Sequence, residues 1–247
     1  MINGVVNAQH QLPIAICSSG TWNILADALR LPSPVRVPML LAEGQTTSIP
    51  LFLVEWRQSG VLSRRYAFMG VDFGLGARVV ASTEECKKMI PALPSMFWQY
   101  LIGPAFLLTA WSHTVASTKG GRIKLEPCLP EHRADTFIEA DECVMLWAHA
   151  RDPYDGSFDR LHVSYSTTED TPWFPRLALF FALRQLYQGM AKICPNNRPV
   201  DAFTVTAAED FDFLIDGELC RADFVSVKVC EDKRVDIFVP ASSGLHQ

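Results

Sequence analysis

The stretch FDFLIDGE, Phe211–Glu218, predicts a tight β-hairpin and points to a chain built mainly from strands. Phe213–Ile215 is a short apolar run, and Asp216-Gly217-Glu218 provides the glycine and acidic residues that a turn between two strands favours. The same turn has a second interpretation, because two carboxylates held on a tight turn can bind Mg²⁺ or accept a hydroxyl proton during phosphoryl transfer. The spacing of the residues permits either role.

Strand-like runs of the same kind fill much of the chain beyond the stiff connector that Pro32, Pro34 and Pro38 form. Many short strands with intervening turns favour a β-sandwich or barrel-like domain. Two helical patterns interrupt the strands, at Glu84–His113 and at Pro175–Ala191. The predicted strands are Ser48–Trp56, Arg65–Met69, Cys143–His149, Leu161–Tyr165, Ala202–Ala207, Phe213–Ile215, Phe224–Val229 and Val235–Val239.

The segment before the connector has a different pattern, in which a strand-like run is followed by a polar loop and a helical run. Leu12–Cys17 is an apolar run that suits a buried parallel strand, and Ile24–Leu29 has helical spacing. The polar loop Ser18–Asn23 between them can bind an anion through backbone amides at a helix N-terminus, or it can be an ordinary capped turn. This is half of a βαβ unit, so either the first domain is vestigial or the chain begins inside it.

Composition excludes several classes of function. The 247 residues include 22 basic and 27 acidic side chains, with a net charge of −5 and no dense Lys/Arg run, which argues against nucleic-acid binding. The seven cysteines are scattered without metal-ligand spacing, as expected for free thiols in a reducing compartment. Ala92–Trp111 is apolar but interrupted by Pro94 and Pro104, which favours a buried or lipid-facing amphipathic helix over membrane insertion.

A glycine-rich segment follows the strand that contains Arg65–Met69. Gly70-Val71-Asp72-Phe73-Gly74-Leu75-Gly76 permits a close approach of the backbone to another group, although the dinucleotide-binding pattern G-x-G-x-x-G is not matched. The helix that follows carries Lys87 and Lys88, which are either a solvated face or a cationic pair directed at a nucleotide.

In this order the elements resemble the diacylglycerol kinase catalytic-domain superfamily, most closely its sphingosine kinase and ceramide kinase-like branch. Ser19–Asn23 is similar to the family loop A-G-[ST]-G-N, and Val71–Met89 resembles the glycine-rich region with its E-K-x-R-R helix. Asp152–Val163 resembles the D-G-x-x-D strand entry, and Phe213–Glu218 looks like the acidic V-D-G-E motif. The resemblance covers nearly the whole chain.

The resemblance implies an α/β plus β-sandwich fold and a kinase that transfers the γ-phosphate of ATP to a lipid hydroxyl with Mg²⁺. Residues 1–36 would be the C-terminal part of a nucleotide-binding domain, and residues 37–247 a β-rich lipid domain with two helical segments. Asp216 and Glu218 would be the catalytic and metal-binding acids, and Ala92–Trp111 would line a lipid pocket. The implied nucleotide-binding residues are Gly20, Thr21, Asn23, Lys87 and Gly217. Such a kinase is expected in the cytoplasm, with peripheral contact to membranes.

Three departures from the family pattern define the alternatives. The G-G-D-G-[TS] motif would stand before INGVVN, where this sequence has Met1, so an N-terminally truncated kinase is expected. Trp22 replaces a glycine of the nucleotide loop, and Arg78–Val80 lacks the acid that would hold a sphingosine amine. A catalytically inactive lipid-binding homologue and a β-rich protein with purely structural motifs are the alternatives.

Overall fold

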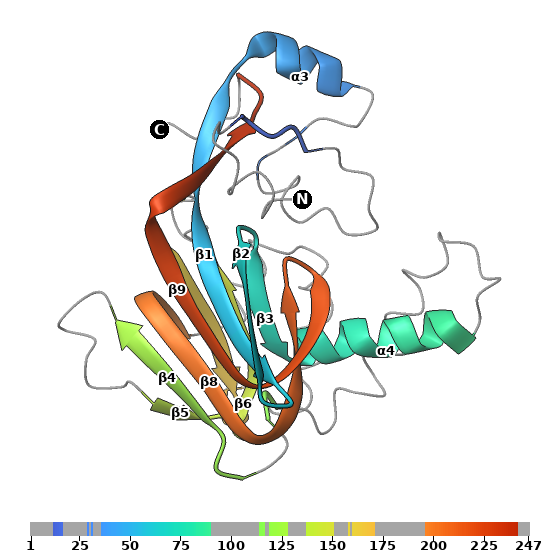
Figure 1. The fold of residues 1–247 in the computed structure, drawn as a ribbon, viewed down its shortest axis with the longest axis vertical. Coiled ribbons are helices and arrows are strands. Elements are labelled where there is room, and N and C mark those ends of the chain that lie inside the picture. The colour runs from blue at the N-terminus through green and yellow to red at the C-terminus, as the bar shows by residue number, and fades with distance from the viewer. Residues whose placement is uncertain are drawn as a thin grey trace.

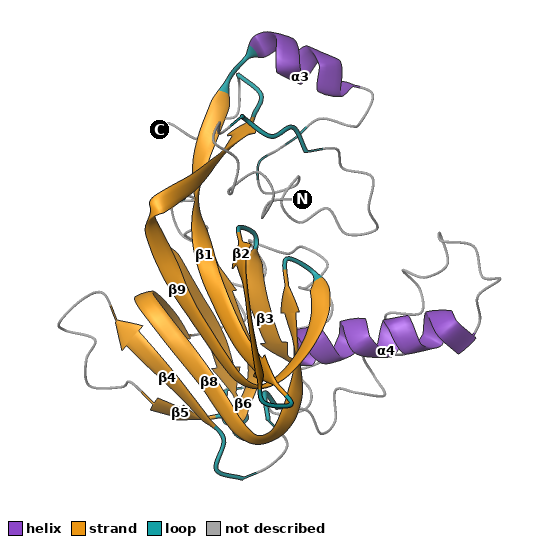
Figure 2. Ribbon diagram, viewed as in Figure 1, coloured by secondary structure: helices purple, strands orange, loops and turns teal. Residues whose placement is uncertain are grey.

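The computed structural model describes residues 12–16, 29, 31, 36–89, 114–116, 119–127, 137–150, 158, 160–170 and 196–241 (Figure 1). Within these ranges the chain is mainly β-sheet, accompanied by the helices α3 and α4 (Figure 2). The helices are α3 (Val37–Glu43) and α4 (Leu75–Met89). The strands are β1 (Thr46–Gln58), β2 (Val61–Ala67), β3 (Gly70–Gly74), β4 (Arg122–Pro127), β5 (Phe137–Glu139), β6 (Cys143–His149), β7 (Leu161–Thr167), β8 (Asn196–Ile215) and β9 (Glu218–Phe238).

The nine strands of the described residues belong to one sheet, whose main order is β2-β1-β9-β8-β3-β6-β7. Strand β7 also pairs with β8, so β8, β3, β6 and β7 form a closed ring of antiparallel pairs. Strands β4 and β5 extend the sheet from the middle of β8. The long strand β8 therefore contributes one end to β7 and the other end to β3.

Two tight hairpins fix the register of the strands around the candidate site. Ser59 and Gly60 connect β1 to β2 with φ of 50° and 80°, and Asp216 and Gly217 connect β8 to β9 with φ of 51° and 82°. Positive φ at both central residues is the type I′ geometry whose twist matches that of the flanking strands, and Asp-Gly favours it. The hairpin predicted from FDFLIDGE is confirmed.

The core lies between the strands that surround Phe73 of β3. This ring stacks on Phe213 of β8 with 5.6 Å between ring centroids, and it meets Phe203 edge-on at 5.8 Å. All three side chains are fully buried. Because side chains alternate along a strand, Val71 and Phe73 point into this core while Asp72 between them points to the opposite face of the sheet.

The glycine-rich segment Gly70–Gly76 is strand β3 followed by the start of α4, and no strand was predicted there. A Cβ atom at Gly70 would overlap the carbonyl oxygen of Ala148, and one at Gly74 would overlap that of Val144, both on the paired strand β6. The glycines therefore allow close packing between strands, rather than a close approach to a ligand.

The helical predictions also need correction. Helix α4 begins at Leu75, nine residues before the predicted start at Glu84. The connector region contains α3. Proline is tolerated in the first turn of a helix, where Pro38 lies, and Gly44 ends α3 with a φ of 66°.

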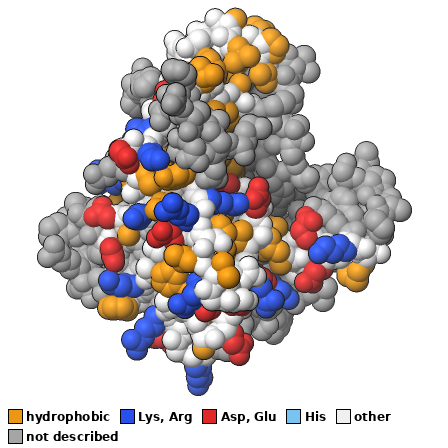
Figure 3. Space-filling model, viewed as in Figure 1, with side chains coloured by type: hydrophobic (Ala, Val, Ile, Leu, Met, Phe, Trp, Pro, Cys, Tyr) orange, Lys and Arg blue, Asp and Glu red, His pale blue; other side chains and the backbone are white. Residues whose placement is uncertain are grey.

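Figure 3 shows hydrophobic side chains gathered over α3, where Met39 and Leu41 are exposed.

Several predicted elements lie outside the described residues: Ala92–Trp111, Pro175–Ala191, Ser18–Asn23 and most of the predicted helix Ile24–Leu29. From the predicted strand Leu12–Cys17, Ile14 forms one parallel bridge with Ile237 of β9. In the part of the chain that the structure describes, no helix is both long and apolar enough to cross a membrane.

Candidate active site at the turn between β8 and β9

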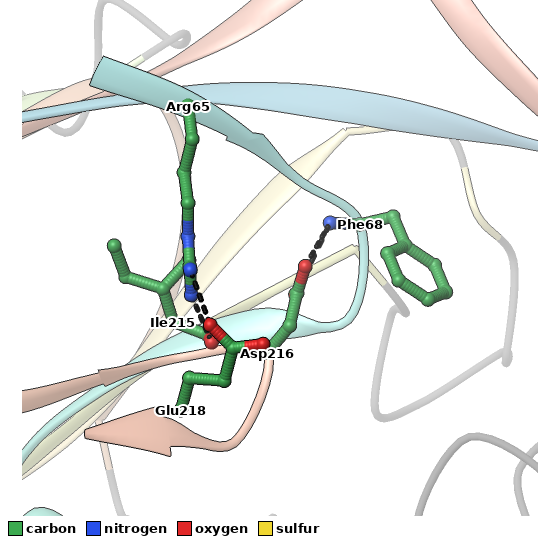
Figure 4. A network of polar contacts seen from close by, with 5 residues as sticks. All are labelled: Arg65, Phe68, Ile215, Asp216 and Glu218. Carbon is green, nitrogen blue, oxygen red and sulfur yellow. Dashed lines mark hydrogen bonds and ion pairs between the residues drawn. The ribbon is translucent and has the colours of Figure 1, made fainter. Parts of the chain in front are cut away.

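Asp216 holds the connection between β2 and β3 through its side chain. Its Oδ1 accepts hydrogen bonds from the backbone amides of Phe68, Met69 and Gly70, at N–O distances of 3.2, 2.9 and 3.2 Å. The amide of Asp216 in turn donates to the carbonyl of Gly70 at 2.9 Å. Figure 4 shows the carboxylate directed at Phe68 and away from Glu218. One aspartate therefore joins two connections that lie far apart in the sequence.

Two opposing effects act on the charge of Asp216. Burial of the carboxyl raises its pKa, while the amides of Met69, Gly70 and Phe68 lower it because they donate to the ionised form. The positive charge of Arg65 lowers it further, and burial outweighs these effects, so the pKa of Asp216 lies above its ordinary value of 3.8. The local hydrogen bonds favour the ionised form, which is the form that accepts from all three amides.

Glu218 lies on the other side of the turn and is the first residue of β9. Its Oε2 forms an ion pair with Nη1 of Arg65 at 2.6 Å, and 74% of its side chain is exposed (Figure 4). Arg65 is only 21% exposed, and its Nη2 donates to the carbonyl of Ile215 at 2.5 Å. A guanidinium can donate to several acceptors at once, so Arg65 fixes both the carboxylate and the backbone of the turn.

The structure therefore brings Asp216 and Glu218 onto one turn but directs their carboxylates to different partners. The carboxylate of Asp216 accepts hydrogen bonds from the backbone amides of Phe68–Gly70, and the carboxylate of Glu218 faces solvent beside Arg65. Among the described residues, no group of three or more His, Cys, Asp or Glu side chains is arranged to hold a metal ion. The turn offers one accessible carboxylate next to a fixed guanidinium, a pair that can contact a cation and an anionic oxygen at the same time.

Of the other predicted site residues, Gly217 belongs to this turn, and the rest cannot be placed against it. Gly20, Thr21 and Asn23 lie outside the described residues, and Lys87 is described only as a backbone position within α4. Gly217 is the exposed second residue of the turn, with space for a Cβ but a φ of 82°. Arg65 was missed as a site residue by the sequence analysis, although it is the first residue of the predicted strand Arg65–Met69; a charged side chain within a predicted strand is the signal that could have found it.

Comparison with known proteins finds solved structures with a similar fold. No protein-family model and no curated protein sequence matches the chain. A crystal structure of a diacylglycerol kinase from Bacillus anthracis str. Sterne is similar, with 14% identity, a TM-score of 0.58, and coverage of 97% of this chain and 73% of that one. Two further structures from the same organism are named as putative diacylglycerol kinases. The first has 13% identity, a TM-score of 0.57, and coverage of 97% of this chain and 72% of that one. The second has 14% identity, a TM-score of 0.56, and coverage of 98% of this chain and 73% of that one. The chain therefore has the fold of these diacylglycerol kinases.

Proposed function

We propose that this protein is a lipid kinase, which transfers the γ-phosphate of ATP to a hydroxyl of a sphingoid base, ceramide or diacylglycerol-type lipid. The observation that carries the proposal is the Arg65–Glu218 pair on the β8–β9 turn, within a fold shared with diacylglycerol kinases. In this proposal residues 1–36 are the C-terminal part of an α/β nucleotide-binding domain, and residues 37–247 form a β-sandwich lipid domain. The protein would contact membranes peripherally from the cytoplasm. Gly20, Thr21, Asn23 and Lys87 would surround the nucleotide phosphates.

The roles of the two acids differ in this proposal. Glu218 would act directly at the triphosphate, because its carboxylate is exposed and Arg65 fixes it from the protein side. Asp216 would position the turn, because its Oδ1 is already engaged by three backbone amides. Phosphoryl transfer depends mainly on positioning and on compensating the charge of the phosphates, so a turn with one exposed carboxylate suits this chemistry.

The turn offers Mg²⁺ one carboxylate ligand, that of Glu218. Mg²⁺ is commonly held by one or two carboxylates together with substrate phosphates, and it does not need a complete cage of protein ligands. In the described part of the chain, the ion pair with Arg65 engages Oε2 of Glu218 and leaves Oε1 for such a contact. Glu218 therefore fits as a single ligand to an ion brought in with ATP, and the bound ion would neutralise charge on the phosphates.

Lipid binding without phosphoryl transfer is the second candidate. One observation favours it: the guanidinium of Arg65 already neutralises Glu218, and no third acid joins them among the described residues. Under this alternative the protein would bind lipid without binding the nucleotide, and substitutions of Glu218 would leave lipid binding unchanged.

The experiment that separates the candidates measures binding and transfer on the full chain. Isothermal titration with Mg-ATP would be compared with transfer of ³²P from labelled ATP to dioctanoylglycerol, ceramide and sphingosine in mixed micelles. We expect saturable binding of Mg-ATP and phosphorylation of at least one lipid. Absence of binding at millimolar nucleotide, together with retained binding of lipid, would exclude the kinase.

Glu218→Gln and Glu142→Gln form a matched pair for this assay. Both replace a glutamate in the described part of the chain, but Glu142 lies between β5 and β6, away from the β8–β9 turn. We expect Glu218→Gln to lower transfer by tenfold or more and Glu142→Gln to leave it at the wild-type rate. An equal effect of the two substitutions would count against a role for the turn.

A further inference from the structure

A cavity of about 290 Å³ lies between the start of α4, the middle of β8 and residues 114–116. This volume is near the lower end of the range for small-molecule sites. The charged side chains that line the cavity are Arg78 of α4, Glu209, Asp210 and Asp212 of β8, and Arg221 of β9. None of them belongs to the residues assigned above to phosphoryl transfer, so the proposed kinase gives this cavity no role.

An irregularity in β8 brings two of the acids to the cavity. The pairing of β8 with β9 shifts here, so that the β8 residues 207–210 lie opposite the single β9 residue Asp223. Extra residues of this kind bend a strand and re-aim its side chains, and they occur often beside functional sites. Glu209 and Asp210 belong to this bulge, are exposed, and have no hydrogen bond or ion pair in the described part of the chain. The bulge therefore offers two available carboxylates.

The two arginines of the cavity share one carboxylate, that of Asp212. Nη1 of Arg78 donates to Oδ2 of Asp212 at 3.2 Å, and Nε of Arg221 lies 3.8 Å from Oδ1. Asp212 thus holds two guanidinium groups beside each other while it balances only one of their charges. Among the described residues Asp212 is the sole partner of either arginine, and the side chain of Arg221 is 61% exposed. Because a guanidinium donates from three nitrogens, donors remain for a ligand.

The start of α4 adds positive potential to the same cavity. Gly74 directly precedes α4, Arg78 lies in its first turn, and both residues line the cavity. The first amides of a helix have no partners within it, and the helix dipole places partial positive charge at this end. The cavity therefore combines groups that favour an anion with two carboxylates that favour a cation.

We propose that this cavity binds a zwitterion that carries a phosphate and an ammonium group. The phosphate contacts Arg78 and Arg221, and the ammonium group contacts Glu209 and Asp210. A phosphate has enough terminal oxygens to accept from both guanidinium groups at once. An anion alone would face the available carboxylates, and a cation alone would face the arginines, so a ligand with both charges is favoured over either.

Two sources supply this chemistry: the headgroup of an aminophospholipid in a bilayer, and a soluble phosphate ester of an amino alcohol. The inference goes beyond the proposed lipid kinase, because the ligand is neither the nucleotide nor the acceptor hydroxyl. It is therefore tested without ATP and without an acceptor lipid.

Isothermal titration of the full chain compares O-phosphoethanolamine, inorganic phosphate and ethanolamine as probes. We expect O-phosphoethanolamine to bind at least tenfold more tightly than either of the other two, since it alone satisfies both charged sides of the cavity. Equal affinities for O-phosphoethanolamine and inorganic phosphate would overturn the inference.

Arg221→Gln and Glu209→Gln each remove one charge from an exposed side chain of the cavity. We expect each to weaken the binding of O-phosphoethanolamine by tenfold or more. Arg221→Gln should also lose the preference over ethanolamine, and Glu209→Gln the preference over inorganic phosphate. A purely structural role of these residues would not change the two preferences separately.

Lys124→Gln and Glu126→Gln are the controls. These exposed side chains form an ion pair at 3.1 Å on β4 and do not line the cavity. We expect both variants to bind O-phosphoethanolamine as wild type does. The inference is wrong if the control variants lose as much affinity as the cavity variants, or if both cavity variants keep the wild-type preferences.

Sedimentation with sucrose-loaded vesicles of phosphatidylethanolamine and phosphatidylcholine distinguishes the two sources. Sedimentation that O-phosphoethanolamine reduces and that Arg221→Gln loses assigns the site to a bilayer headgroup. Binding of O-phosphoethanolamine without such sedimentation assigns it to a soluble ester, and either result supports the inference. Because none of these measurements needs phosphoryl transfer, a protein that fails the kinase assay still tests the cavity.

Discussion

Replacing Asp72 by asparagine should stabilise the protein at neutral and alkaline pH. Desolvation by burial raises the pKa of Asp72 from 3.8 to about 7, an effect that outweighs the lowering by the backbone amide of Phe73. At about 1.4 kcal/mol for each pH unit, the difference corresponds to roughly 4 kcal/mol of unfolding free energy. Asparagine carries no charge to bury, so Asp72→Asn should recover much of this amount.

The sign of the effect depends on pH. Below pH 3.8 the carboxyl is protonated in the folded and unfolded chain alike and contributes nothing. Between pH 3.8 and about 7 the folded protein keeps a proton that the unfolded chain has lost, so wild-type stability falls as the pH rises. Above about pH 7 both states are ionised, and the full cost of the buried charge remains.

Urea unfolding at pH 4 and at pH 8 measures the difference between wild type and Asp72→Asn. We expect the variant to gain about 2–4 kcal/mol relative to wild type between these two pH values, since the asparagine does not titrate. The pH dependence of all other groups cancels in the comparison. A difference between the proteins that stays constant from pH 4 to pH 8 would refute the reasoning, because it would place the carboxyl in contact with water.

Three further predictions concern the strands and the turn. Gly74→Ala should destabilise the protein by about 3 kcal/mol in urea unfolding, because its φ of 72° and the carbonyl of Val144 both exclude a Cβ atom. Gly60→Ala is the control: position 60 has a similar φ but open space around it, so this substitution should cost about 1 kcal/mol. Asp216→Ala should lower the unfolding free energy by about 2–4 kcal/mol, since three amides lose their acceptor, and an unchanged melting temperature would contradict this role. Glu218→Gln should change the unfolding free energy by less than about 1 kcal/mol, because its side chain is 74% exposed, and calorimetry can check this.

The strand pattern of the sequence predicts most of the sheet correctly. The prediction Cys143–His149 coincides with β6, and Leu161–Tyr165 lies within β7. Strands β3, β4 and β5 are absent from the prediction. Strand β3 was missed because of its glycines, and only the carbonyl groups of the neighbouring strand show why glycine is needed there. Local propensity cannot contain this information, since Gly74 and Val144 are far apart in the sequence.

The candidate site shows a similar limit. Asp216 and Glu218 are spaced as a pair in the sequence, and the hairpin predicted around them is present. Their carboxylates separate because Asp216, with a φ of 51°, turns its side chain toward Phe68–Gly70, while Glu218 begins β9 beside Arg65. The partner of each acid comes from a segment about 150 residues earlier, so the spacing within the turn could not distinguish their roles.

The bonds from Asp216 to Phe68, Met69 and Gly70 have a consequence for the order of folding. They join residues 148, 147 and 146 positions apart, so they close a loop that contains more than half of the chain. Such distant contacts form late, because the entropy of the intervening chain must be lost first. We therefore expect the β1–β2 hairpin to form early, and the β2–β3 connection to become ordered only when residue 216 arrives. During synthesis on the ribosome, the residues between 70 and 216 must all emerge before this acid can hold the β2–β3 connection.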